Sequence, residues 1–172
     1  VGPENFVEVE EEAVGSVHDT TRRFLILGGG AAAFNAAKAI RERDRTASVI
    51  LLTAESVLPY NRPMLTKSMM AGFSPEQLAI EPQAWYDERN INVLTGRTVT
   101  AIDVDAHQVK CADGLTLVYD KLIYALGARC FVPPIPGHDR ANVVAIRSLD
   151  DAQRVLSMIG GMKHAVVIGG GV

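Results

Sequence analysis

The chain of 172 residues has the length of one ordinary domain, or of one domain and part of a second. Its 48% hydrophobic and 22% charged residues are typical of a globular protein. The net charge of −3 does not suggest a nucleic-acid partner, and no apolar run is long enough to predict a membrane span.

The two cysteines and the acidic N-terminus restrict the setting further. Cys111 and Cys130 lack the spacing of a zinc site or a disulfide framework, so both are expected to be free core thiols and no metal ligand is predicted. Residues 1–22 contain six acidic residues and are predicted to be an acidic tail or linker. They lack the basic start of a secretory signal, which favours a cytoplasmic protein.

The first ordered stretch has the pattern of a dinucleotide-binding unit. An apolar strand over Phe24–Leu27 runs into a glycine turn, and Ala31–Ile40 is predicted to be a helix. The turn reads Gly28-x-Gly30-x-x-Ala33, in which the first glycine makes the tight turn and the second allows a pyrophosphate to approach the backbone. The N–H groups at the helix N-terminus would then face the phosphates.

A second strand follows at the spacing that such a unit requires. Ser48–Thr53 is predicted to be a buried strand, and Glu55 lies just past its end. A carboxylate at this position can accept hydrogen bonds from the hydroxyls of an adenosine ribose. The alternative is an ordinary βαβ unit with a solvated glutamate at the end of the strand.

The loop after this strand carries two cations. Residues 55–63 contain two prolines and are predicted to be a loop, and a short helix is predicted from Pro63 to Met70. Arg62 and Lys67 flank the start of that helix, which fits an anionic cofactor beside the glycine turn. The alternative is that both are solvated side chains on a loop.

The middle of the chain predicts a helix and an inserted antiparallel hairpin. A helix is expected between Pro82 and Asn90, with Trp85 facing the core rather than a ligand. Asp113-Gly114 is a strong hairpin signal between two of the short strands that follow. These strands are predicted over residues 91–94, 99–104, 108–111 and 115–119.

The last third predicts a boundary and a second nucleotide-binding unit. A strand over Lys121–Leu126 is followed by Phe131–Gly137, whose three prolines indicate a stiff connector. Ser148 is expected to cap a helix that reaches about Met158. His164–Val172 repeats the opening pattern of an apolar strand and a glycine triplet, although a glycine run alone could be chance.

Five motifs in this order resemble those of the pyridine nucleotide-disulfide oxidoreductase superfamily. They are the Gly28 turn, the Glu55 strand end, the Pro59–Lys67 loop, the Ala125–Ala128 strand end and the second glycine strand. The resemblance is greatest to the flavin branch with rubredoxin reductases, ferredoxin reductases and the FAD part of NADH-dependent nitrite reductases. It covers residues 23–172.

The resemblance implies an α/β fold with a Rossmann-like, three-layer FAD-binding unit and an inserted antiparallel β hairpin or meander. The first elements of a second nucleotide-binding domain would follow. Residues 23–130 would form the N-terminal segment of the FAD-binding domain. Residues 131–172 would be the connector and the truncated start of the NAD(P)-binding domain.

The resemblance also implies the residues of a cofactor site. The glycine turn would hold the FAD pyrophosphate and Glu55 the ribose, with Arg62 along the cofactor, Lys67 near the isoalloxazine and the Val99 backbone at the adenine. Many relatives have threonine where this chain has Leu126, which puts a side-chain hydrogen bond there in doubt. The implied FAD-binding residues are Gly28, Gly30, Ala31, Ala32, Ala33, Glu55, Arg62, Lys67, Val99, Ala125, Leu126 and Gly127. No catalytic residue is assigned.

The implied chemistry is hydride transfer from NAD(P)H to FAD and electron delivery to a redox protein such as rubredoxin or ferredoxin. Thiol chemistry is disfavoured because residues 65–72 contain no cysteine. The family's FAD domain is completed by a segment after the NAD domain. The 172 residues alone are therefore expected to be inactive and to bind FAD weakly or not at all.

Several alternatives remain open at this point. The chain could be a nucleotide-binding module that uses only an adenylate group and has no redox role. An NADH oxidase or peroxidase is a third possibility, which the missing cysteine disfavours. Residues 1–9 resemble the end of a rubredoxin domain, although a tail of unrelated origin would look similar. The choice between NADH and NADPH, the electron acceptor and the oligomeric state are not predicted.

Overall fold

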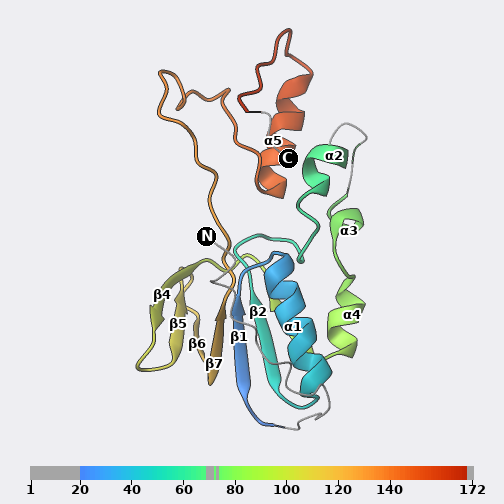
Figure 1. Ribbon diagram of the computed structural model, residues 1–172, viewed down its shortest axis with the longest axis vertical. Helices are drawn as coiled ribbons and strands as arrows, with labels where there is room; N and C mark the ends of the chain where they lie inside the picture. The colour runs from blue at the N-terminus through green and yellow to red at the C-terminus, as the bar shows by residue number, and fades with distance from the viewer. Residues whose placement is uncertain (1–19, 69–71, 73, 170–172) are drawn as a thin grey trace, which may run out of the picture.

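A four-stranded parallel sheet forms the centre of the computed structural model, which describes residues 20–68, 72 and 74–169 (Figure 1). The predicted tail lies almost entirely outside the described residues. The strand order is β3-β2-β1-β7, and all three neighbouring pairs are parallel. These strands are β1 (Arg23–Leu27), β2 (Ser48–Leu52), β3 (Ile91–Leu94) and β7 (Lys121–Tyr124).

The sheet is covered on both faces, as parallel sheets usually are. On one face Ile26 and Val49 pack against Ala33 and Phe34 of α1 (Ala31–Arg43). On the other face, Leu25 packs in a cluster with residues of a separate antiparallel sheet of order β4-β5-β6. Its strands are β4 (Val99–Asp103), β5 (Gln108–Cys111) and β6 (Thr116–Val118). The predicted three-layer α/β fold with an antiparallel insertion is thus confirmed.

The side chains of β1 point alternately to the two faces of the sheet, so this strand packs against both covering layers. Leu25, Ile26 and Leu27 are each at most 1% exposed, and successive side chains of a strand point to opposite faces. Ile26 therefore joins the cluster below α1, whereas Leu25 and Leu27 join the cluster below the antiparallel sheet. A continuous apolar run in the sequence thus marks a strand with two buried faces.

Three short helices connect β2 to β3. They are α2 (Met64–Ser68), α3 (Pro75–Leu78) and α4 (Gln83–Glu88). The short helix α3 is not predicted from the sequence; it begins with Pro75 and a capping box between Ser74 and Gln77. The end of the predicted helix at Met70 lies outside the described residues.

Trp85 of α4 packs against the core, as predicted, and a second aromatic residue of the same helix is buried more deeply. Trp85 contacts Phe34, with 5.3 Å between the ring centroids, but its side chain is only partly buried. The fully buried ring is that of Tyr86, which is 0% exposed. Arg89 covers the outer part of Trp85, with its guanidinium carbon 4.4 Å from the ring centroid.

The strand β7 forms one edge of the parallel sheet. It pairs with β1 alone among the described strands, from Phe24 opposite Lys121 to Leu27 opposite Tyr124. At its start, the Asp120 carboxylate accepts hydrogen bonds from the Arg23 backbone and guanidinium. The strand β7 is shorter than the predicted strand, because Ala125 and Leu126 lie beyond its end.

The segment after the parallel sheet extends away from the two sheets and ends in a helix beside α2 (Figure 1). The predicted connector has no helix or strand between residues 125 and 148. It leads into α5 (Leu149–Ile159), whose N-terminus has a capping box formed by Ser148 and Asp151. The predicted cap at Ser148 is confirmed.

Two predictions for the outer segments are wrong. Residues 164–168 form no strand, and Val166, Val167 and Ile168 are 69–87% exposed. An isolated segment cannot satisfy its backbone groups as a strand, and no described strand lies beside it to pair with them. Cys130 is exposed rather than a core thiol because it lies in the extended connector, whereas Cys111 is buried as expected. Residues 170–172 of the second glycine motif lie outside the described residues.

A buried carboxylate holds the turn after α1. Asp44 is 6% exposed and accepts a hydrogen bond of 2.5 Å from the Thr20 hydroxyl. It also accepts from the backbone N–H groups of Thr20, Thr46 and Ala47 at 2.9–3.2 Å. The Thr20 hydroxyl first, and then these N–H groups, lower the pKa of Asp44 from 3.8 to about 2.

Replacing Asp44 with asparagine should therefore destabilise the fold in a pH-dependent way. The folded pKa lies below the unfolded value, so the stabilisation by the carboxylate is complete above pH 4 and is lost as the pH falls through about 2. Urea denaturation of the wild type and Asp44→Asn at several pH values measures this. The difference in the free energy of unfolding between the two proteins should be largest at neutral pH and shrink towards pH 2. A difference that stays constant with pH would contradict this role of the carboxylate.

Candidate functional site

The glycine turn is held tightly between the ends of two strands. Gly28 has a φ of +130°, and its N–H donates a hydrogen bond of 2.8 Å to the carbonyl of Leu52. A Cβ at Gly28 would overlap the carbonyl oxygen of Ala125, just past β7. A Cβ at Gly29 would overlap the side chain of Thr53. Gly28 thus makes the tight turn that the sequence predicts, and Gly29 is restricted by the space beside Thr53 alone.

Gly30 opens onto free space at the start of α1. It is the N-cap residue with a φ of −100°, and no side chain among the described residues caps the helix. A Cβ there would meet only Nε of Arg62, at 3.8 Å. Ala31 and Ala32 are exposed, whereas Ala33 is 0% exposed and lets the helix lie on the sheet. The helix therefore presents uncapped N–H groups at its positive end, which is the geometry of an anion site.

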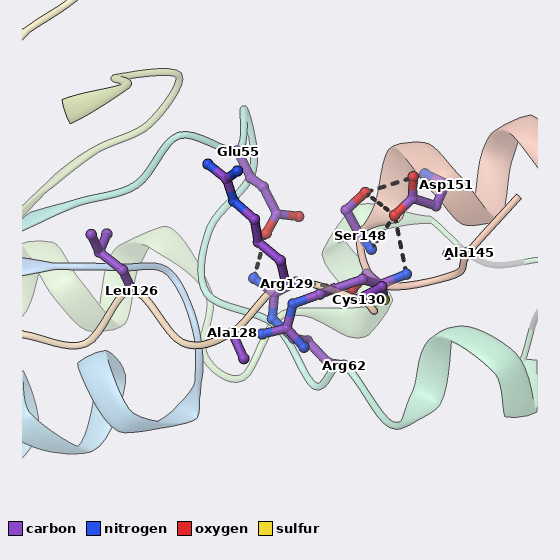
Figure 2. A pocket seen from close by; sticks show the side chains of 10 residues that line it. Glu55, Arg62, Leu126, Ala128, Arg129, Cys130, Ala145, Ser148 and Asp151 are labelled. Atoms are coloured by element: carbon purple, nitrogen blue, oxygen red, sulfur yellow. Dashed lines mark hydrogen bonds and ion pairs between the residues drawn. The ribbon is translucent and has the colours of Figure 1, made fainter. Parts of the chain in front are cut away.

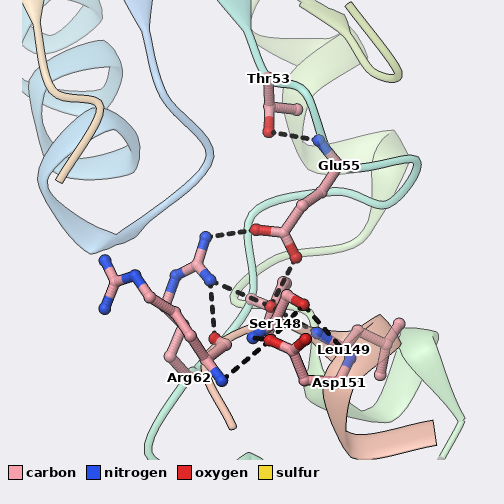
Figure 3. Close-up of polar contacts among 8 residues, drawn as sticks. Thr53, Glu55, Arg62, Ser148, Leu149 and Asp151 are labelled. Atoms are coloured by element: carbon pink, nitrogen blue, oxygen red, sulfur yellow. Dashed lines mark hydrogen bonds and ion pairs between the residues drawn. The ribbon is translucent and has the colours of Figure 1, made fainter. Parts of the chain in front are cut away.

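Two of the charged residues that the sequence singles out, Glu55 and Arg62, lie together (Figure 3). The Arg62 guanidinium forms an ion pair with Glu55, and both side chains are about three-quarters buried. The backbone N–H of Glu55 donates to the hydroxyl of Thr53 at 3.3 Å, which orients the residue as it leaves β2. Glu55 is thus partly shielded from water and directly neutralised, rather than solvated at the end of a strand.

The hydroxyl of Tyr60 completes this network. It donates a hydrogen bond of 2.6 Å to Glu55 and accepts from Arg62 at 3.2 Å and from the backbone N–H of Leu149 at 3.0 Å. Burial first, and then the bond to Glu55, raise the pKa of Tyr60 well above its ordinary value of 10. The hydroxyl is therefore protonated at every physiological pH.

The start of α5 approaches the same cluster. Arg62 donates a hydrogen bond of 3.0 Å to the carbonyl of Arg147. The carboxylate of Asp151 accepts from the N–H groups of Arg147 and Ser148 and from the Ser148 hydroxyl, at 2.7–3.0 Å. Burial opposes ionisation of Asp151, but these bonds outweigh it and lower its pKa. The helix start is thus capped by its own side chains.

An open cleft of about 400 Å³ lies between this helix start and the ends of the strands. Figure 2 shows Glu55 and Arg62 on one side and Ser148 with Asp151 on the other. Gly127 has a φ of +73°, and a Cβ there would lie 2.9 Å from the Arg147 guanidinium. The remaining lining residues are Leu126, Ala128, Arg129, Cys130, Ala145 and Arg147.

The structure brings most of the predicted site residues together, but not all. Gly28, Gly30, Glu55 and Arg62 meet at one end of the parallel sheet, next to the strand end formed by Ala125, Leu126 and Gly127. Lys67 is exposed at the end of α2 and does not line the cleft. Val99 begins β4, opposite Cys111, and packs in the core between the two sheets.

Tyr60 and the residues around Ser148 also belong to this site, although they are not among the predicted site residues. Tyr60 has a local signal, because it stands between Glu55 and Arg62 in the same loop. Arg147, Ser148 and Asp151 have none, since more than 80 residues separate them from Arg62. Among the described residues, no cluster of His, Cys, Asp and Glu side chains could hold a metal ion, and no helix is long and apolar enough to cross a membrane.

The chain is similar in sequence to several known proteins. It is 38% identical over 151 residues to the ferredoxin–NAD(+) reductase component of the anthranilate 1,2-dioxygenase system of Burkholderia cepacia, covering 86% of this chain and 37% of the relative. It is 37% identical over 154 residues to apoptosis-inducing factor 3 of Mus musculus, covering 90% and 25%.

Several solved structures are similar to this chain in fold and in sequence. The NADH:rubredoxin oxidoreductase of Clostridium acetobutylicum superposes with a TM-score of 0.71 and 30% identity, covering 82% of this chain and 36% of that one. Putidaredoxin reductase in its covalent complex with putidaredoxin gives a TM-score of 0.70 and 30% identity, covering 80% and 34%.

These similarities concern one part of longer proteins. The chain spans between a fifth and a little over a third of the length of the curated relatives that it matches. The family match itself extends over residues 22–172, which includes the glycine turn, the Glu55 and Arg62 cluster, the cleft and α5. On this match the chain belongs to the pyridine nucleotide-disulphide oxidoreductase family.

Proposed function

We propose that this chain carries the FAD site of an NAD(P)H-dependent oxidoreductase that passes electrons to a small redox protein. The observation that carries the proposal is the convergence of the uncapped α1 N-terminus, Glu55 and Arg62 at one end of the parallel sheet. This places donors for a diphosphate beside an acceptor for ribose hydroxyls, which is the pattern that a dinucleotide requires.

Two features of the described residues support FAD as the ligand, namely the open helix N-terminus and the carboxylate beside it. The open side of Gly30 and the first N–H groups of α1, at Ala31, Ala32 and Ala33, would hold the pyrophosphate together with Arg62. Glu55 would accept from the ribose, because a carboxylate has about four acceptor positions and the described contacts with Tyr60 and Arg62 use two. When bound, FAD would accept a hydride from the nicotinamide and release electrons to the partner.

The other predicted contacts are part of the same proposal. Ala125, Leu126 and Gly127 would line the cofactor beside the glycine turn, and Val99 would offer its backbone to the adenine. Lys67 would contact the flavin only if α2 or its side chain moved inwards, since it is exposed here. We place the FAD-binding segment at residues 23–130 and the start of an NAD(P)-binding domain at residues 131–172.

The proposed partner is a redox protein of the ferredoxin or rubredoxin type. Support comes from the names of the relatives, which include a ferredoxin–NAD(+) reductase component, an NADH:rubredoxin oxidoreductase and a putidaredoxin reductase bound to putidaredoxin. The absence of cysteine from residues 65–72 favours electron transfer by flavin alone over thiol chemistry.

Equilibrium dialysis with FAD and with ADP, read by absorbance, tests the site directly. Arg62→Ala should weaken FAD binding about tenfold or more, because hydrogen bonds to charged groups are worth about 1.5–3 kcal/mol. Glu55→Ala should weaken the binding of both FAD and ADP, and Lys67→Ala should have the smallest effect on binding. Lys121→Ala is the matched control, since this exposed lysine lies at the opposite end of the parallel strands.

The same measurement separates the alternative functions. If Arg62→Ala and Lys67→Ala bind FAD as the wild type does while Glu55→Ala does not, the site is an adenylate module without a redox role. If the wild type binds neither FAD nor ADP at millimolar concentration, the proposed site is wrong.

A further inference from the structure

A single buried hydroxyl joins the loop after β2 to a helix that is far away in the sequence. Tyr60 is 3% exposed, and its hydroxyl contacts Glu55 after β2, Arg62 in its own loop and the backbone N–H of Leu149 at the start of α5. Leu149 is 89 residues from Tyr60 along the chain. The hydroxyl therefore lies where the proposed ribose acceptor meets the helix that follows the connector.

The hydrogen-bonding capacity of this hydroxyl is fully used. A tyrosine hydroxyl has one proton to donate and accepts through its oxygen lone pairs. Glu55 receives the proton, while Arg62 and the N–H of Leu149 donate to the oxygen. If Glu55 moved away, the proton would turn to another acceptor and disturb the bonds to Leu149 or Arg62. The positions of Glu55 and α5 are consequently linked.

The described attachments of α5 converge on the same loop region. Leu149 and Ala152 pack in one buried cluster with Tyr60, Leu65 and Leu78. The polar contacts from this region to the helix start are those of Tyr60 with the N–H of Leu149 and of Arg62 with the carbonyl of Arg147. Both polar contacts come from side chains that also bind Glu55. A change at Glu55 would thus reach both of them at once.

We propose that Tyr60 is a positioning residue whose hydroxyl couples ligand binding at Glu55 to the docking of α5. This rests on the proposed function, in which ribose hydroxyls donate to Glu55 and fix its carboxylate. A fixed Glu55 holds the Tyr60 proton, which leaves the oxygen free to accept from Leu149. By thermodynamic reciprocity, a docked α5 raises the affinity for the ligand by the same factor.

Amide hydrogen exchange of the full 172-residue chain, with and without ADP, tests the coupling. ADP carries the ribose and diphosphate that the site would recognise. In the wild type, ADP should slow exchange of the α5 amides, Leu149 included, about fivefold or more. In Tyr60→Phe the dissociation constant for ADP should rise by a similar factor, and α5 exchange should no longer respond to ADP. A merely structural role would change exchange without ligand but not the response to ligand.

Tyr86→Phe is the matched control, because its ring is 0% exposed and its hydroxyl has no hydrogen-bond partner among the described residues. It should bind ADP and respond to it as the wild type does. If Tyr60→Phe fails to fold, the wild-type exchange experiment still decides. ADP binding without slower exchange of α5 overturns the coupling alone, and so does a Tyr60→Phe variant that responds normally. A wild type that binds no ADP overturns the proposed function together with the coupling.

Discussion

Replacing Gly28 with alanine should lower the free energy of unfolding by at least about 3 kcal/mol or prevent folding. Two effects add at this position. A φ of +130° is strained for any residue with a Cβ, and that Cβ would overlap the carbonyl oxygen of Ala125. Relief requires moving the turn away from β7, which disturbs the 2.8 Å hydrogen bonds from Gly28 to Leu52 and from Ala125 to Leu27. Urea denaturation followed by circular dichroism measures the loss.

Two other glycines separate the contributions. Gly114 has a φ of +88° but no atom within 4 Å of an added Cβ, so Gly114→Ala reports strain alone and should cost about 1 kcal/mol. Gly30 has an ordinary φ and open space, so Gly30→Ala should leave the fold intact apart from a weaker N-cap. A Gly28→Ala variant as stable as Gly114→Ala would show that β7 does not hold the turn.

Replacing Leu149 with alanine should release α5 from the body of the protein while the sheets stay folded. Leu149 is 4% exposed and packs against Tyr60, Leu65 and Leu78, and truncating a buried leucine costs about 2–5 kcal/mol. Few other contacts secure this helix, so we expect the loss to appear as local unfolding. Amide exchange should accelerate at least about thirtyfold across residues 149–159 and remain unchanged in β1 and β2.

Gln153→Ala provides the control on the same helix. Gln153 is exposed, and alanine has the higher helix propensity, so this variant should keep α5 docked and exchange as slowly as the wild type. Equal acceleration of exchange in α5 and in the parallel sheet of Leu149→Ala would contradict local release. It would show instead that the helix and the sheets unfold as one cooperative unit.

The sequence predicts the central sheet well because its signals are local. Phe24–Leu27 and Ser48–Thr53 are apolar runs bounded by glycine or loop residues, and both become buried strands. The Asp113-Gly114 dipeptide likewise marks the turn between β5 and β6. In each case the pattern that identifies the element is contained within the element and the turn beside it.

The candidate site is less predictable because contacts distant in sequence decide it. From the sequence, Glu55 is expected to be a free acceptor of hydrogen bonds, whereas in the fold it pairs with Arg62 and Tyr60. The constraint on Gly29 comes from Thr53, which lies just past the end of β2. The predicted strand at residues 164–168 has a strong apolar signal, yet the described structure offers it no partner strand. Pattern alone reports what a segment can form, not what lies beside it.

The antiparallel sheet has a consequence for the entropy of the chain. The edge strand β7 pairs with β1 across a separation of 97 residues, as does the contact between Arg23 and Asp120. Closing a loop costs more entropy the longer its flexible part is. The last part of this interval, residues 99–118, contains β4, β5 and β6, which pair with their sequence neighbours through short turns. Once these hairpins form, the flexible part of the loop that β7 must close is shorter. The antiparallel layer that covers the parallel sheet thus also lowers the entropy cost of adding its last strand.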